Sequence, residues 1–98
     1  MTTPPLFYPS PFRLEDGSEL GYKLSKDMPV SIRIYDMRGN QVFVEHIGTG
    51  DLGGRIGYNY VPFTEDMFTN GSLPAGPYFY LLLSDGDLLG KGKFAILP

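Results

Sequence analysis

Residues 72–83 have the sequence Ser72-Leu73-Pro74-Ala75-Gly76-Pro77-Tyr78-Phe79-Tyr80-Leu81-Leu82-Leu83. A turn rich in proline and glycine here precedes six consecutive apolar or aromatic residues. A short apolar run that contains aromatic residues and is bounded by turn signals is typical of a buried strand. We therefore predict a central strand over residues 77–83, and we expect the rest of the chain to pair with it or to pack on it.

Six further segments carry strand signals, with turn signals between them roughly every ten residues. In residues 30–36, Val30, Ile32 and Ile34 alternate with other side chains, as in a strand that buries one face. The other predicted strands cover residues 6–12, 19–24, 41–47, 55–63 and 88–97. About seven short strands with such turns are typical of an immunoglobulin-like antiparallel β-sandwich, which is the fold we predict.

The first predicted strand, residues 6–12, contains Pro9 and Pro11. Proline cannot donate a backbone hydrogen bond, so within sheets it is confined to edges and bulges. We therefore expect an edge strand here, with Phe7 and Phe12 turned toward the core.

The connections carry their own signals. After residues 30–36, either Gly39 or Asn40 can take the positive φ that a tight hairpin requires. The glycine-rich residues 48–54 are predicted to form a mobile loop between the sheets. Only residues 64–71 suit a helical turn, for which Thr64 is a suitable cap.

The composition limits the class of protein. A chain of 98 residues, 42% of them hydrophobic, suits one domain. We assign residues 1–5 to an N-terminal extension or linker and residues 6–98 to a single β-sandwich domain. The net charge of −3, with no basic stripe, argues against nucleic-acid binding. No apolar run is long enough to span a membrane, so no direct membrane insertion is expected. Cysteine is absent, which leaves the redox compartment open.

Motifs that would carry chemistry are missing or weak. His46 is the single histidine, and no residues at ligand spacing accompany it. Residues 48–54 lack the Gly-Lys-Ser/Thr ending of a phosphate-binding loop. No serine stands in a Gly-x-Ser-x-Gly motif. We therefore predict no catalytic residue, no cofactor and no metal site. Calcium binding stays open for the loop carboxylates, which are Glu15, Asp16, Asp51, Glu65, Asp66, Asp85 and Asp87.

Four aromatic residues around the sixth segment allow two interpretations. Tyr58, Tyr60, Phe63 and Phe68 can fill the core, which is the interpretation favoured for a chain without tryptophan. Alternatively, Tyr58 and Tyr60 are aromatics of a ligand-binding face on which a sugar stacks. Exposure of their rings is the observation that separates the two interpretations.

Three blocks of sequence together resemble a known family. Residues 8–12, Tyr-Pro-Ser-Pro-Phe, are similar to the opening of C-terminal sorting domains of the bacterial type IX secretion system and of the related immunoglobulin-like domain of flagellar hook-capping proteins. Residues 31–42 resemble the hairpin of that family, and residues 70–80 resemble its strand that begins Pro-x-Gly-x-Tyr. The similarity covers nearly the whole chain.

This resemblance implies a non-catalytic, extracytoplasmic module, secreted or at the cell surface, that acts in sorting or surface anchoring. Its partner is then a protein: the secretion machinery, a host protein or neighbours in an assembly. The C-terminal strand, if it lies at a sheet edge, can accept a further strand from such a partner. The residues expected to matter are structural, namely Pro9, Pro11, Phe12, Tyr35, Gly39, Gly76 and Tyr78.

Residues 1–5 lack the basic and apolar segments of a signal peptide. Either the chain is not exported by that route, or it is a piece of a longer exported protein. Two other functions stay open: a structural subunit of a multi-protein complex or filament, and a small carbohydrate-binding module that uses Tyr58 and Tyr60. An enzyme is the least favoured function.

Overall fold

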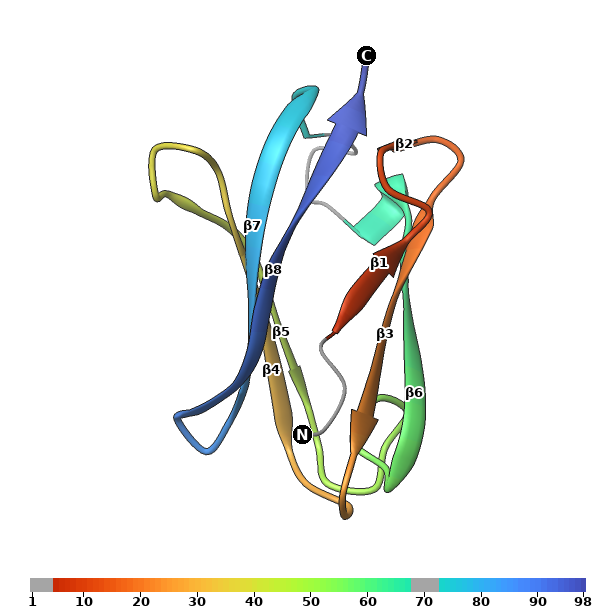
Figure 1. The fold of residues 1–98 in the computed structure, drawn as a ribbon, viewed down its shortest axis with the longest axis vertical. Helices are drawn as coiled ribbons and strands as arrows, with labels where there is room; N and C mark the ends of the chain where they lie inside the picture. The colour runs from red at the N-terminus through yellow and green to blue at the C-terminus, as the bar shows by residue number, and fades with distance from the viewer. Residues whose placement is uncertain (1–4, 68–72) are drawn as a thin grey trace.

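The computed structural model describes residues 5–67 and 73–98. Within these ranges the chain is almost entirely β, with eight strands and one short 3₁₀ helix (Figure 1). The elements are β1 (Leu6–Tyr8), β2 (Phe12–Arg13), β3 (Ser18–Leu24), β4 (Val30–Tyr35), β5 (Gln41–Ile47), β6 (Gly57–Phe63), η1 (Glu65–Met67), β7 (Gly76–Ser84) and β8 (Asp87–Leu97).

The strands form two sheets that pack face to face as a sandwich, with the layers side by side in Figure 1. One sheet has the order β1-β3-β6 and the other has the order β2-β8-β7-β4-β5. The chain changes sheet at every connection between consecutive strands except those from β4 to β5 and from β7 to β8. This order corresponds to an immunoglobulin-like sandwich in which β5 joins the sheet of β4, β7 and β8. The predicted fold class is therefore confirmed.

The predicted edge strand over residues 6–12 has the expected inward residues, but it is two short strands, β1 and β2, and not one. Phe7 and Phe12 are both buried, but Phe7 belongs to β1 and Phe12 to β2, in opposite sheets. The chain crosses at Pro9 and Pro11, whose preceding peptide bonds are both cis. The division into β1 and β2 gives the sandwich eight strands. Because β2 pairs with β8 in parallel, the sandwich is not wholly antiparallel.

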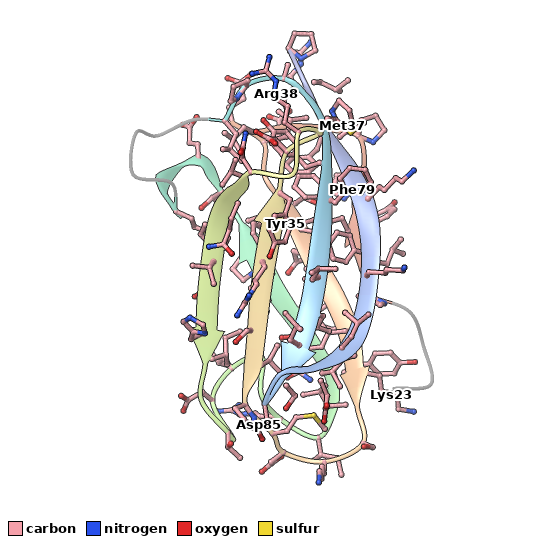
Figure 2. All side chains as sticks on the ribbon, turned by 90° about the vertical axis from the view of Figure 1, so that its left-hand side faces the viewer. Lys23, Tyr35, Met37, Arg38, Phe79 and Asp85 are labelled. Atoms are coloured by element: carbon pink, nitrogen blue, oxygen red, sulfur yellow. The ribbon has the colours of Figure 1, made fainter. Side chains whose placement is uncertain are left out.

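The predicted central strand is confirmed as β7, which lies between β8 and β4. Its run of apolar residues serves two faces, since neighbouring side chains of a strand point in opposite directions. Tyr78 and Tyr80 are buried, whereas Phe79 is only half-buried on the outer face. Figure 2 shows this outer face, with Phe79 on β7 beside Tyr35 on β4, its partner in the register.

Aromatic rings hold the two sheets together at the end of the sandwich where β1 crosses to β2. The Phe7 ring centroid lies 4.3 Å from that of Phe94 and 4.9 Å from those of Phe63 and Tyr80. Each such pair stabilises the fold by about 0.5–1.5 kcal/mol beyond the area that it buries. Phe7 contacts rings from both sheets, so it is the residue through which β1 locks them together.

The hairpin between β4 and β5 follows the expected turn chemistry. Gly39 has a φ of 87°, as predicted for either this residue or Asn40. The Asp36 carboxylate accepts hydrogen bonds from the backbone amides of Arg38 and Asn40, each at 2.9 Å. These bonds hold the pKa of the Asp36 carboxyl below its usual value, and the bond from the Asn40 amide has the largest effect.

The glycine-rich loop joins the two sheets as predicted, but it is packed rather than open. The Tyr22 hydroxyl donates a hydrogen bond of 2.6 Å to the carbonyl of Gly53. The amide of Met28 donates to the carbonyl of Gly54, and the amide of Gly54 donates to the carbonyl of Asp51. The backbone hydrogen bond from Met28 to Gly54 thus ties the loop to the turn between β3 and β4.

The predicted helical turn is the 3₁₀ helix η1, which follows Thr64 directly. The amide of Met67 donates a hydrogen bond to the carbonyl of Thr64. Phe68, which was also expected near the core, lies outside the described residues.

Candidate functional site

The outer face of the three-stranded sheet is the candidate site. We call it the tyrosine face, and it consists of the outward residues of β1, β3 and β6: Leu6, Tyr8, Glu19, Gly21, Lys23, Tyr58, Tyr60 and Pro62. Alternation along each strand places these side chains outside while their neighbours fill the core.

The register arranges the tyrosine face in rows across the sheet. Leu6, Gly21 and Tyr60 form the middle row. Tyr8, Glu19 and Pro62 form the row on one side, and Lys23 and Tyr58 stand opposite each other on the other side. A groove of about 270 Å³ lies over this face.

Gly21 is the bare centre of the groove. A Cβ at Gly21 would lie 3.3 Å from Cε1 of Tyr60, so the Tyr60 ring leans over the glycine. An aromatic ring laid over a strand glycine covers backbone that would otherwise face water. The groove thus has a floor of backbone and walls of aromatic and aliphatic side chains.

Tyr58 and Tyr60 are largely exposed, at 61% and 64% of their surface. The favoured interpretation, that they fill the core, is therefore wrong for these two residues and right for Phe63, which is buried. The reason is phase: in β6 the inward positions are Asn59, Val61 and Phe63.

Tyr8 and Leu6 belong to this face but were not predicted to do so. They are 75% and 63% exposed. Their outward position could have been predicted from the sequence, because an inward Phe7 requires both of its neighbours in the strand to point outward. Their meeting with Tyr60 across β3 depends on sheet order, which local alternation does not contain.

Charge on the tyrosine face is limited to Glu19 and Lys23, within the three strands that form it. The Lys23 ammonium lies 5.4 Å from the centroid of the Tyr58 ring, a cation–π distance. The residues stand on the same strand on either side of Gly21, so the face carries one negative and one positive end.

The outer face of the five-stranded sheet is a second, less exposed surface. Phe79, Leu81 and Leu83 on β7 are half-buried, and the Lys93 ammonium lies 5.5 Å from the centroid of the Phe79 ring. His46 is exposed on β5, where its Nδ1 shares a hydrogen bond of 2.9 Å with the Ser31 hydroxyl. The Lys93 side chain covers part of the Phe79 ring, as long charged side chains commonly do on apolar surface.

The residues predicted to be structural occupy special positions in the sandwich. Pro9 and Pro11 lie where the chain changes sheet, and the Ser18 hydroxyl donates a 2.7 Å hydrogen bond to the carbonyl of Pro9. Gly76 begins β7 with a φ of 139°, in the range where a side chain is disfavoured. The Tyr78 hydroxyl donates a hydrogen bond to the carbonyl of Pro74 and thereby holds the preceding turn.

Glu45 is an inward acid that the sequence did not reveal. It pairs with Ile32 in the register, and one of its carboxylate oxygens is buried without a hydrogen-bond partner among the described residues. Its charge adds to burial, the larger cause, in raising the pKa of the Tyr22 hydroxyl far above the usual value. Glu45 and Tyr22 are thus electrostatically coupled inside the sandwich.

Within residues 5–67 and 73–98, no three acidic, histidine or cysteine side chains gather in a way that would hold a metal ion. No helix in that part of the chain has the length and apolar character to cross a membrane. Comparisons with protein-family models, curated proteins and solved structures found no match to this chain.

Proposed function

We propose that this chain is a non-catalytic, extracytoplasmic module that sorts or anchors a larger bacterial protein through contact with a protein partner. The resemblance of residues 8–12, 31–42 and 70–80 to sorting domains motivates the proposal. The observation that carries it is the open edge of the C-terminal strand, β8.

Strand β8 pairs with β7 over nearly its whole length. On its other side β8 pairs only at Ile96 and Leu97, which face the short strand β2. Within the described residues, the stretch from Asp87 to Ala95 therefore has no backbone partner on that side. An unpaired edge of this length offers hydrogen-bonding groups to an added strand.

The side chains along β8 suit a regulated contact. Lys91 and Lys93 are exposed, and lysines on an edge strand oppose indiscriminate pairing with other chains. A partner that carries carboxylates beside its own strand would overcome this barrier. The edge thus favours an acidic strand of a partner protein over a second copy of β8.

The test is export of a reporter. A periplasm-directed fluorescent protein carrying this chain at its C-terminus is expressed in a bacterium with a type IX secretion system, and cell-surface and medium fractions are assayed. We expect the fusion to leave the periplasm. Lys91→Glu with Lys93→Glu should reduce export at least about tenfold, since like charges across an interface oppose binding.

Lys26→Glu is the matched control, because Lys26 is an exposed lysine in the turn between β3 and β4. Its export should equal that of the unaltered fusion. Retention of the unaltered fusion in the periplasm, at normal levels of folded protein, would contradict the proposal.

Carbohydrate binding is a second candidate, favoured by the exposure of Tyr58 and Tyr60 beside a groove. Tyrosine rings stack on the apolar face of a sugar, and the Glu19 carboxylate can accept hydrogen bonds from sugar hydroxyls. Titration against a panel of soluble oligosaccharides tests this candidate. Tyr58→Ala and Tyr60→Ala should each abolish binding, while Tyr35→Ala on the opposite sheet should leave it unchanged.

A further inference from the structure

The tyrosine face gathers more exposed apolar surface than a solvated sheet face needs. Leu6 and Tyr8 on β1 and Tyr58 and Tyr60 on β6 are each more than 60% exposed, and these two strands flank β3 in the sheet. Contiguous exposed patches of this kind mark interaction sites in soluble proteins. The question is which partner fits the pattern of charge and shape on this face.

The charges on the face are balanced about its centre. Glu19 and Lys23 each lie two residues from Gly21 on β3, in opposite directions, which places them about 7 Å away along the strand. Their side chains stand on the same face, since residues two apart in a strand point the same way. A partner must therefore present a positive charge over Glu19 and a negative charge over Lys23.

A second copy of this chain meets that requirement. We propose that the tyrosine face is a homodimer interface, in which the three-stranded sheets of two copies face each other. The two-fold axis lies between these facing sheets, perpendicular to the strands, and passes over Gly21. Rotation about this axis reverses the strand direction. It therefore places Glu19 opposite Lys23 of the partner subunit, and Lys23 opposite Glu19 of the partner subunit.

Shape agrees with this arrangement. The middle row, Leu6, Gly21 and Tyr60, meets its own symmetry mate. Because Gly21 has no side chain, the Tyr60 ring lies low over the sheet at the axis. Tyr58 comes opposite Pro62 of the partner subunit, where an aromatic ring can pack on the proline ring. An axis parallel to the strands would instead set Glu19 against the partner's Glu19, so charge selects the first arrangement.

This arrangement is isologous: every contact across it occurs twice. One substitution therefore changes two contacts in each dimer. Glu19→Lys leaves only lysines at both positions and Lys23→Glu leaves only glutamates, so each variant alone repels itself. A mixture of the two variants pairs opposite charges at both places.

The test is sedimentation equilibrium of the purified chain over a concentration series up to about 1 mM, a range that covers weak dimers. We expect the unaltered chain to form dimers. If each reversed contact costs about tenfold in affinity, each single variant should dimerise about 100-fold more weakly, because two contacts change. An equimolar mixture of the variants, and the double variant Glu19→Lys/Lys23→Glu, should both recover dimers.

Both residues are exposed, so the variants should melt within about 4 °C of the unaltered chain, which separates loss of dimer from loss of fold. A chain that stays monomeric throughout the series, with or without a bound glycan, overturns the proposal. So does a mixture of the two variants that stays monomeric while the unaltered chain dimerises. Export of the reporter is measured with β8 variants, so the sorting proposal and the dimer proposal fail independently.

Discussion

The buried position of Tyr80 depends on the absence of a Cβ at Gly92, its neighbour on β8. Its buried ring crosses over Gly92, which faces it in the register between β7 and β8. The Tyr80 hydroxyl reaches the carbonyl of Pro5 and donates a hydrogen bond of 2.8 Å. This bond joins the central strand to the start of β1. Because Gly92 has no side chain, the Tyr80 ring has room to reach Pro5 and hold the first strand in place.

Gly92→Ala should therefore destabilise the fold by about 1–3 kcal/mol, the usual cost of overpacking a core. The added Cβ would lie 2.7 Å from Cζ of Tyr80 and 3.0 Å from its Cε1, closer than such atoms approach. Urea unfolding measures the loss. In a Tyr80→Leu background the added cost of Gly92→Ala should shrink, and an equal cost in both backgrounds would show that the ring is not the cause.

Gly76→Val should destabilise the fold for a different reason. A Cβ at Gly76 meets nothing within 4 Å, but the φ of 139° lies where only glycine is comfortable. Backbone strain of this kind costs about 1–3 kcal/mol. Ala75→Val, at the exposed neighbouring position, is the control and should change stability by less than about 0.5 kcal/mol. An unchanged melting temperature for Gly76→Val would contradict the argument.

At the scale of elements, β1 and β2 decide how the sandwich closes. The segment that contains Pro9 and Pro11 leaves one sheet and enters the other, so the two sheets share one continuous edge segment. Phe7 and Phe12 then enter the same core from opposite sheets, with ring centroids 6.4 Å apart. A short edge strand that changes sheet leaves less unpaired edge than a long one would.

The loop between β5 and β6 offers the sharpest test at this scale. A Cβ at Gly54 would lie 2.5 Å from the carbonyl oxygen of Gly48 and 2.8 Å from that of Met28, and both are backbone atoms that cannot rotate away. We expect Gly54→Ala to break the hydrogen bonds between this loop and the turn before β4. The free energy of unfolding should fall by about 2 kcal/mol, and amide exchange at Met28 should become faster.

Gly48→Ala is the control within the same loop. Its Cβ would meet only the carboxylate of Asp51, an exposed side chain that can move aside. Stability should therefore change by less than about 0.5 kcal/mol. Equal losses for the two variants would mean that any side chain in the loop is harmful, and not only one that meets the backbone carbonyls around Gly54.

For the molecule as a whole, we expect the buried tyrosines to make stability depend on pH in the alkaline range. Burial raises the pKa of Tyr22, Tyr78 and Tyr80 above the ordinary value, and the Glu45 charge adds to the effect at Tyr22. The folded chain therefore holds these protons to higher pH than the unfolded chain does. Their contribution to stability is complete below the ordinary tyrosine pKa of about 10 and is lost as the pH rises above it.

We therefore expect the urea midpoint of unfolding to fall progressively as the pH rises from about 9 to 11, since ordinary tyrosines titrate near 10. Tyr22→Phe should make this decline shallower, because one of the groups that resists deprotonation is removed. Tyrosinate absorbance measured in parallel shows when the rings titrate. A midpoint that does not change over this range would contradict the burial of these hydroxyls as the cause.

Local alternation was sufficient to predict much of the fold. It placed Val30, Ile32 and Ile34 in the core, while the apolar run between turn signals identified β7 as the central strand and the proline-containing edge segment gave the inward Phe7 and Phe12. It failed in β5, where Phe43 and Ile47 point toward the core with Glu45 between them, because consecutive apolar residues make the phase ambiguous. It also left open whether Tyr58 and Tyr60 face the core or solvent. Phe63 is inward, and residues an odd number of positions from it in the strand point the other way, so alternation from Phe63 places both tyrosines outside.

The amino-acid sequence by itself determined the fold class, the order of the strands along the chain and the turns at Gly39 and Gly76. These depend on alternation, glycine and proline, which act within a few residues. Only the tertiary structure decided that Gly21 lies between Leu6 and Tyr60, with Glu19 and Lys23 on either side. Sheet order and register come from contacts between residues distant in sequence, so the tyrosine face does not exist until the strands have paired.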